Sequence, residues 1–184
     1  MGDILIALWF FVPVAFANMA PVVVSKMSWF ARFTTPIDFG GTFRGRRILG
    51  ANKTWRGLIA GIIAGTLAFW LLQLTAGQSS WLADFPGDTA YADLPTLLYG
   101  VLFGIGTLGG DAVKSFIKRQ MDTAPGKPWP FFDQIGEILG AILITLPFVM
   151  FGFWVYVWVA VLWVVIDLGV SALAYLAGWK ERPW

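Results

Sequence analysis

Five long apolar runs leave this chain few folds to choose from. Each comes close to the roughly 20 residues that a helix needs to cross a hydrocarbon layer about 30 Å thick. With 58% hydrophobic residues, 13% charged residues and a mean hydropathy of +0.70, the chain is far more apolar than a soluble domain needs to be. We therefore predict an all-α integral membrane protein, a single domain over residues 1–184 with about five transmembrane helices. The predicted spans are 4–24, 57–76, 94–113, 135–151 and 154–178.

Charged residues fall in blocks that a bilayer would sort to one side. Residues 26–56 hold seven Lys and Arg with one acid, Asp38, and residues 114–134 hold four more basic residues. Residues 77–93, between them, hold three Asp and no basic residue. Basic loops stay on the cytoplasmic side. We therefore expect a protein of the cell (inner) membrane with both basic loops in the cytoplasm and the N-terminus outside. The site should then face the cytoplasm. Ala15-Phe16-Ala17 looks like a signal-peptide cleavage site, but no Lys or Arg precedes it, which disfavours cleavage.

Two missing residue types narrow the chemistry. The chain has no Cys, which removes disulfides and thiol nucleophiles, and no His, which removes the commonest general base and transition-metal ligand. The groups that remain available for catalysis are carboxylates, the cationic side chains of Lys and Arg, and a bound hard metal ion.

Glycines four residues apart indicate where membrane helices approach closely. Such faces serve contacts within one chain, contacts between two copies in a homodimer, or room for a ligand. The pairs and triplets are Gly57, Gly61 and Gly65, Gly100 with Gly104, Gly106 with Gly110, and Gly136 with Gly140.

The first candidate binding cluster lies just before the second span, among Gly45, Gly50 and Gly57. The guanidinium groups of arginine and the ammonium group of lysine are suited to binding a polyphosphate, and a helix N-terminus favours anions. A basic anchor that touches acidic lipid heads is the open alternative. The cluster comprises Arg46, Arg47, Lys53, Thr54 and Arg56.

The second candidate cluster lies at the inner end of the third span. Asp111, Lys114, Ser115 and Lys118 fall within an arc of about 100° on one helical face. A carboxylate within a membrane helix is costly and calls for a partner or a function. Asp111 either neutralises a neighbouring lysine or works on metal or phosphate.

Two further acids enter the fourth span. Asp133 and Glu137 are four residues apart, so both can face one cleft. Mg²⁺ is typically held by one or two carboxylates plus substrate phosphates and water. The alternative is that Asp133 caps the helix while Glu137 pairs with a lysine.

Several short motifs, in order along most of the chain, resemble those of the CDP-archaeol synthase family. The Ser115-x-x-Lys118-Arg119 pattern with the later Asp133 is also similar to a reduced form of the CDP-diacylglycerol synthase signature. The matching segments are Asn18-Met19-Ala20-Pro21, Pro36-Ile37-Asp38-Phe39-Gly40, Gly45-Arg46-Arg47-Ile48-Leu49-Gly50, Lys53-Thr54-Trp55-Arg56-Gly57, Gly110-Asp111, Ser115 to Arg119, Asp133-Gln134 and Gly140-Ala141.

The resemblance implies a Mg²⁺-dependent cytidylyltransferase that joins CTP to a lipid phosphate and releases pyrophosphate. The partners it implies are CTP, the bilayer and a lipid phosphate, of archaeol type by family default, with no nucleic acid. The implied catalytic residues are Asp111, Lys118, Arg119 and Asp133. The implied substrate-binding residues are Arg46, Arg47, Lys53, Thr54, Arg56, Ser115, Asn18 and Asp38, and the implied metal ligands are Asp111, Asp133 and Glu137.

One departure from the related signature affects the metal prediction. That signature places a second Asp three positions after the one that matches Asp133, where this chain has Gly136. Glu137 or Asp111 would then supply the other oxygen, for one metal ion or two. A transporter or channel for anionic substrates and a purely structural membrane subunit remain the alternatives to an enzyme.

Overall fold

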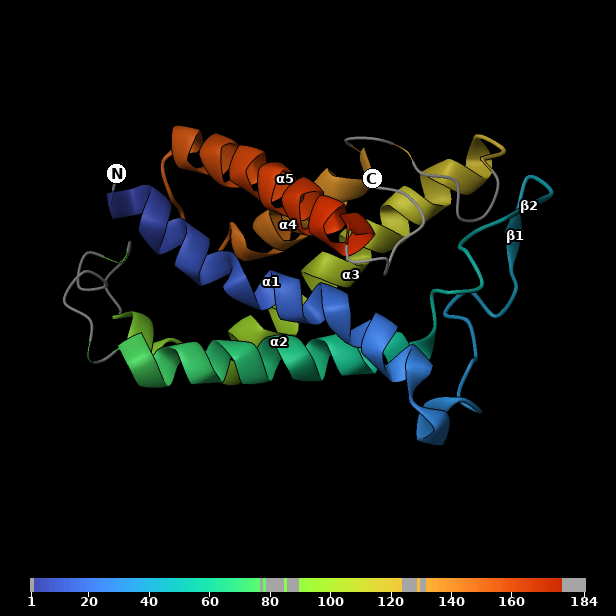
Figure 1. The fold of residues 1–184 in the computed structure, drawn as a ribbon, viewed down its shortest axis with the longest axis horizontal. Helices are drawn as coiled ribbons and strands as arrows, with labels where there is room; N and C mark the ends of the chain where they lie inside the picture. Colours follow the sequence, from blue (N-terminus) through green and yellow to red (C-terminus); the bar gives the residue numbers. More distant parts are fainter. Residues whose placement is uncertain are drawn as a thin grey trace.

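The computed structural model describes residues 2–76, 78, 85, 90–123, 129 and 132–176. It confirms the all-α prediction, with one small hairpin that the sequence did not suggest (Figure 1). The helices are α1 (Gly2–Lys26), α2 (Trp55–Ala76), α3 (Thr96–Gln120), α4 (Phe132–Thr145) and α5 (Phe153–Leu176), with short 3-10 helices η1 (Ser28–Phe30) and η3 (Tyr91–Asp93) and strands β1 (Thr42–Phe43) and β2 (Arg46–Arg47).

Helices α1, α2 and α3 run side by side, and α3 also packs along α4. An aromatic core around Phe10 joins the first three, with ring centroids 5.0 Å apart for Phe10 and Phe103 and 5.5 Å apart for the stacked rings of Phe69 and Tyr99. These rings come from the first half of α1, the second half of α2 and the first half of α3. The core therefore lies away from the hairpin, at the end of the bundle where α1 starts (Figure 1).

Close helix contacts confirm the glycine prediction. A Cβ added at Gly104 would overlap Ile62 of α2, and one added at Gly110 or Gly140 would overlap the backbone of the facing helix in the α3–α4 pair. Small residues thus let α3 approach α2 on one side and α4 on the other.

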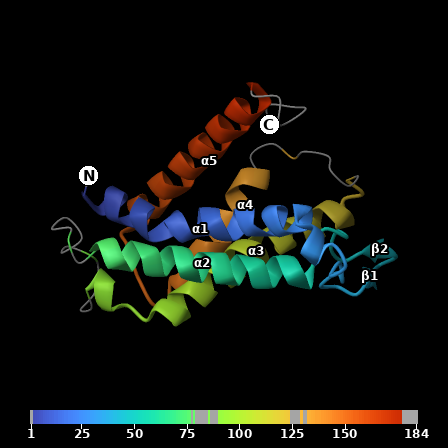
Figure 2. The same cartoon turned by 60° about the horizontal axis from the view of Figure 1, so that its bottom comes forward.

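The fourth predicted span, 135–151, is longer than the helix found there, whereas the fifth, 154–178, agrees closely with α5. Helix α4 has 14 residues and ends at Thr145, two residues before Pro147, because a proline disfavours helical geometry in the residue before it. At 1.5 Å per residue it is about 21 Å long. Helices α1, α2 and α3 are long and apolar enough to cross a membrane, whereas α4 from Ile135 and the α5 segment Phe153–Gly169 are shorter apolar helices. Figure 2 shows α5 leaving the bundle at a steep angle. The number of spans stays a prediction.

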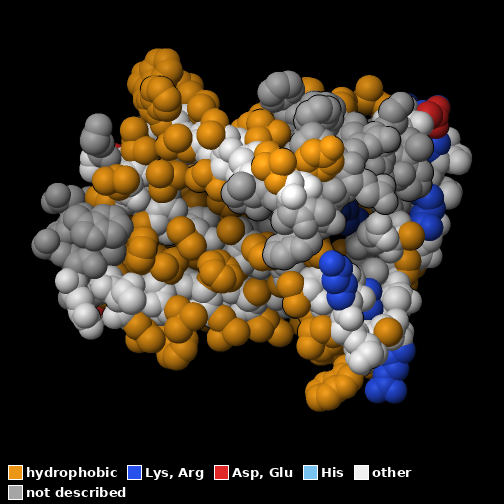
Figure 3. Space-filling view, in the orientation of Figure 1, with side chains coloured by type: hydrophobic (Ala, Val, Ile, Leu, Met, Phe, Trp, Pro, Cys, Tyr) orange, Lys and Arg blue, Asp and Glu red, His pale blue; other side chains and the backbone are white. Residues whose placement is uncertain are grey.

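The ends of α1 and α3 and the start of α2 lie at the same end of the molecule as the hairpin (Figure 1). The hairpin turns through Arg44 and Gly45, whose φ values of 52° and 76° are those of a two-residue turn with both central residues left-handed. Lys and Arg side chains gather at this end of the molecule, while apolar side chains cover the helices (Figure 3). The first basic segment and the end of α3 therefore share one end, as the charge pattern predicts.

Candidate active site

The loop between α1 and α2 is organised by one carboxylate. Asp38 Oδ1 accepts hydrogen bonds from the backbone N–H of Gly40 and from the Arg47 guanidinium, both at 3.0 Å, and Oδ2 accepts one from Leu49 N–H at 2.9 Å. Burial acts to raise the pKa of Asp38, but the donors from Leu49, Gly40 and Arg47 together lower it below the ordinary 3.8. Both oxygens are engaged within the loop, and substrate binding by Asp38 stays a prediction.

Backbone pairing closes this loop next to α2. Ile37 N–H donates to Lys53 O at 2.8 Å, and Trp55 N–H donates to Thr35 O at 3.1 Å. Thr54 then caps α2, because its hydroxyl accepts the Gly57 N–H at 3.3 Å. Lys53 and Thr54 are thereby fixed at the helix N-terminus, a position that favours anions.

A polar cavity of about 640 Å³ opens between this loop, the second half of α1 and α3. Five predicted site residues line it: Asn18, Lys53, Thr54, Arg56 and Asp111. Helix α1 runs unbroken through Asn18 and Pro21 to Lys26. The structure thus brings together residues that lie 93 positions apart in sequence, from Asn18 to Asp111.

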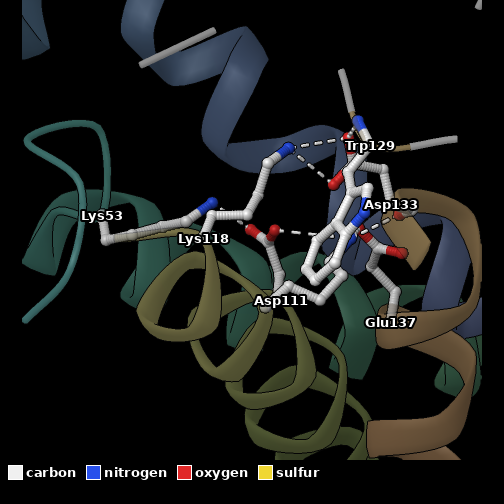
Figure 4. Close-up of polar contacts among 7 residues, drawn as sticks. Lys53, Asp111, Lys118, Trp129, Asp133 and Glu137 are labelled. Atoms are coloured by element: carbon white, nitrogen blue, oxygen red, sulfur yellow. Dashed lines mark hydrogen bonds and ion pairs between the residues drawn. The ribbon is translucent and has the colours of Figure 1, made fainter. Parts of the chain in front are cut away.

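Beside this cavity, lysines meet carboxylates from three segments of the chain (Figure 4). The Lys53 ammonium pairs with Asp111 Oδ2. Lys118 Nζ lies 2.8 Å from both oxygens of Asp133, and Trp129 N–H donates to Asp133 Oδ2 at 2.7 Å. The alternation of charge lets a cluster of acids and bases pack closely at partial burial.

Lys114 lies at the centre of this cluster; the sequence placed it on the same helical face as Asp111 but not among the implied site residues. Its ammonium is 2.5 Å from Glu137 Oε1 and 3.7 Å from Asp111 Oδ1, and it donates to the carbonyl of Asp133. The sequence offered the i, i+3 spacing from Asp111 as a signal, but nothing in the sequence showed that Glu137 faces the same point from another helix.

Other predicted residues lie elsewhere. Arg46 contacts the carbonyl of Gln120 and the carboxylate of Asp122, which attaches the hairpin to the end of α3. Arg47 binds Asp38, and neither arginine lines the cavity. Ser115 lies against Gly50, 3.5 Å from where a Cβ would be.

Two further arginines have unused donors. Arg56 Nη1 donates to the carbonyl of Phe30 at 2.5 Å. The Nε atoms of Arg56 and Arg119 are buried and make no hydrogen bond to any residue in the described part of the chain. Of the predicted Asp133-Gln134 motif, the Gln134 side chain lies outside the described residues.

Mg²⁺ binds oxygen ligands, and the carboxylates near the cavity can supply them. No group of three or more acids close enough to hold a metal ion occurs among the described residues. Asp111 lines the cavity and Asp133 lies beside it, each bound to a lysine. One or two carboxylates beside a cavity that also contains basic side chains are compatible with Mg²⁺. This ion typically keeps water molecules and phosphate oxygens as its remaining ligands.

An apolar groove of about 690 Å³ runs along the outside of α1 and α2 and reaches the cavity at Arg56. Arg56 lines both the groove and the cavity. The sequence did not predict this groove. Its walls are Phe16, Met19, Ala20, Val23 and Val24 of α1, Ile59, Ala60, Ile63, Ala64 and Leu67 of α2, and Phe30, Phe33, Thr35 and Trp55 around its mouth.

Known proteins resemble this chain along its whole length. A family model described as CarS-like, CDP-archaeol synthase, matches residues 1–184. CDP-archaeol synthases of Pyrococcus horikoshii and Pyrococcus furiosus are each 35% identical and cover 100% of this chain, which in turn covers 99% and 100% of them. The CDP-archaeol synthase of Methanoregula boonei is 39% identical over 82% of this chain and 90% of its own length.

The fold is also shared with a solved structure. A protein described as an intramembrane enzyme for archaeal membrane lipids biosynthesis superimposes with a TM-score of 0.72 and 29% identity, covering 89% of this chain and 91% of its own. The likeness agrees with a helical membrane protein.

Proposed function

This chain belongs to the CDP-archaeol synthase family, and on that premise we propose that it transfers CMP from CTP to an archaeol-type lipid phosphate, with Mg²⁺ as cofactor and pyrophosphate as product. It is a membrane nucleotidyltransferase. We further propose that residues 1–184 form one catalytic domain whose site faces the cytoplasm, where CTP is available.

One observation carries the proposal: the polar cavity and the apolar groove meet at Arg56. A nucleoside triphosphate needs a charged, water-accessible site. A lipid phosphate needs an apolar groove for its chains that ends at a cation for its phosphate. The cavity offers Lys53, Arg56 and the N-terminus of α2 to phosphates. The groove, which shares Arg56 with the cavity, offers apolar walls against which the alkyl chains of a lipid can pack. The reacting phosphates of both substrates would thus meet near Arg56.

The reaction needs no covalent nucleophile from the protein. An oxygen of the lipid phosphate attacks the α-phosphorus of CTP, a new P–O bond forms, and the bond between the α- and β-phosphates breaks to release pyrophosphate. The absence of Cys and His is therefore no obstacle. The protein contributes alignment of the two phosphates and stabilisation of the charge that develops between them.

The chain's own residues divide this work. Lys53 and Arg56 bind and orient phosphate oxygens inside the cavity, and Lys118 and Arg119 are the cations available to the leaving pyrophosphate. Asp111 and Asp133 are the proposed Mg²⁺ ligands, and Asn18 and Thr54 line the wall on which the nucleotide rests. Bound Mg²⁺ would supply charge neutralisation for the triphosphate. Lys53 and Lys118 pair with Asp111 and Asp133 in this structure. When Mg²⁺ and CTP are both bound, these lysines would turn to phosphate oxygens.

The family favours an enzyme over a transporter or channel, since full-length relatives are named as synthases. The two readings also differ in what they predict. A transporter would move a labelled anion across vesicles without changing it, whereas the proposed enzyme converts CTP.

The test is CTP-dependent pyrophosphate release by the purified protein with Mg²⁺ and a panel of lipid phosphates. We expect release with an archaeol-type phosphate, weaker release with diacyl or polyprenyl phosphates, and none without lipid. Asp133→Asn should abolish turnover while the protein keeps its helical content. Normal turnover by this variant would refute the proposed role of Asp133, and no release from the unaltered protein with any lipid phosphate would refute the function.

A further inference from the structure

The partly buried Lys114 lies where α3 packs against α4, and it is not among the described residues that line the cavity assigned to the nucleotide by the proposed function. We propose that Lys114 is a positioning residue: it ties α4 to Asp111 and so sets how the two proposed metal ligands face each other, with Glu137 as its counter-ion and not as a metal ligand. The inference rests on the proposed function and concerns how its site is held in shape.

The first observation is the number of groups that one ammonium joins. Lys114 Nζ lies 2.5 Å from Glu137 Oε1, lies 3.7 Å from Asp111 Oδ1 and donates to the carbonyl of Asp133. Asp111 belongs to α3, whereas Asp133 and Glu137 belong to α4. A single side chain therefore joins the two helices that each bring one proposed ligand.

The second observation is the path that the side chain takes. A Cβ at position 136 would lie 2.6 Å from Lys114 Cγ and 2.7 Å from Lys114 Cε, closer than side-chain contacts allow. Only the missing side chain of Gly136 lets the lysine stem pass across α4. The backbones also touch here, because a Cβ on Gly110 would overlap the Gly136 carbonyl. The lysine stem therefore lies in the space left by the missing side chain of Gly136, and the close packing leaves the stem little freedom.

The third observation separates Glu137 from the metal. The Glu137 side chain is 9% exposed and that of Lys114 is 12% exposed. A buried charge is costly unless a partner of opposite sign meets it, and here each supplies the other. Asp111 and Asp133, at 23% and 31%, are the more accessible carboxylates. Of these four residues, Asp111 is the one that lines the nucleotide cavity among the described residues, so the exposure of Asp133 and not cavity lining sets it apart from Glu137.

Lys114 therefore acts through Asp111, not on substrate. Lys53 holds Asp111 Oδ2 from the cavity side, and Lys114 stands behind Oδ1. If Lys53 turns to a phosphate when CTP binds, Lys114 remains to keep the carboxylate aimed at the cavity. Groups that orient a metal ligand typically change metal affinity or activity by about 10- to 100-fold when they are removed.

The decisive experiment measures the Mg²⁺ concentration for half-maximal thermal stabilisation of the full-length protein in saturating CTP, and the same half-saturation for turnover. For Lys114→Met, which keeps the stem and removes the charge, we expect half-saturation to rise about tenfold or more by both readouts, with the KM for lipid phosphate unchanged. A residue that merely stabilises the fold would lower the thermal midpoint at every Mg²⁺ concentration and leave half-saturation as it was. That second result would overturn the proposal.

Gly136→Ala gives an independent variant because it displaces the lysine stem and keeps every charge. It should also raise Mg²⁺ half-saturation, about threefold to tenfold by the same principle. Gly109→Ala is the matched control, since a Cβ there meets nothing within 4 Å, and it should leave half-saturation unchanged. If Lys114→Met does not fold, this pair decides: equal behaviour of the two alanine variants overturns the proposal.

Glu137→Gln tests the counter-ion role. The Lys114→Met, Glu137→Gln double variant should have a higher thermal midpoint than Lys114→Met alone, because it leaves no unpaired buried carboxylate. If Glu137→Gln removed the Mg²⁺-dependent stabilisation while Lys114→Met left it intact, Glu137 would be a ligand and the proposal wrong. The unaltered protein separates the two levels: without Mg²⁺-dependent stabilisation or pyrophosphate release, it is the proposed function that fails.

Discussion

The cavity and the groove that share Arg56 are opposite in physical character. The cavity is formed by a loop, the N-terminus of α2 and parts of α1 and α3, and ionised side chains meet in it. The groove is formed by two helices and, apart from Arg56 and Thr35, its walls are apolar. A charged substrate can be recognised by a few directional contacts, whereas an alkyl chain is recognised by shape and length. The difference indicates that changes in one region should affect one substrate and spare the other.

The largest expected effect comes from a carboxylate of the cavity. Asp111→Asn should lower the turnover rate by about 10²- to 10³-fold, the size seen when one charge-stabilising group is lost from a reaction centre. Pyrophosphate release measures it. Asp122→Asn is the control, because Asp122 is a 68% exposed carboxylate that pairs with Arg46 at the far side of the hairpin. Equal losses in both variants would show that charge at this end, and not the cavity, matters.

Lys53→Met should separate the two substrates. A hydrogen bond to a charged group contributes about 1.5–3 kcal/mol, so we expect the KM for CTP to rise about 10- to 100-fold. The KM for the lipid phosphate should change little. Steady-state kinetics with each substrate varied in turn provide the measurement, and a larger change for the lipid would reverse the assignment of the two regions.

Filling the groove should have the reverse selectivity. Ala60→Trp places a large ring between the groove walls and should raise the KM for the lipid phosphate about tenfold, with the KM for CTP unchanged. Leu74→Trp, at a 55% exposed position of the same helix outside the groove, is the control. If both tryptophan variants behaved alike, the groove would have no special role in lipid binding.

The smallest effect concerns the loop that forms one wall of the cavity. Because the pKa of Asp38 is lowered on folding, its contribution to stability is present above the ordinary pKa of 3.8 and is lost as pH falls through the lower value in the folded state. Asp38→Asn should lower stability at neutral pH by about 1–3 kcal/mol and flatten the pH dependence below about pH 4. Thermal midpoints between about pH 3 and pH 7 measure it, and a variant as stable as the original would exclude this role.

Some of this comparison follows from the sequence. Hydropathy predicts the membrane helices, charge blocks predict a basic end, and glycine spacing predicts the close contact of α3 with both neighbours. The Lys53-Thr54-Trp55-Arg56-Gly57 motif correctly marks the start of α2, where Thr54 is the cap. These are local properties, set by residues within a few turns of each other.

What the sequence could not predict depends on contacts between distant segments. Arg46 and Arg47 look as suited to phosphate as Lys53, yet they bind Asp122 and Asp38. Lys114 belongs to the cluster only because Gly136 and Glu137 of another helix face it. Apolar residues along a membrane helix do not reveal which of them face lipid and which form a groove. Charge counts therefore predicted the basic end of the molecule, and the ion pairs of the structure show which of its side chains lie together.

The central claim is that the cytidylyl group of CTP passes to a lipid phosphate where the two regions meet. The most direct measurement follows labelled phosphorus from CTP in a reaction with Mg²⁺ and an archaeol-type phosphate, followed by solvent extraction. The account predicts that label in the α-phosphate enters the lipid phase and that label in the γ-phosphate stays in water as pyrophosphate. Label from the γ-phosphate in the lipid phase, or release of pyrophosphate with no label in lipid, would contradict it.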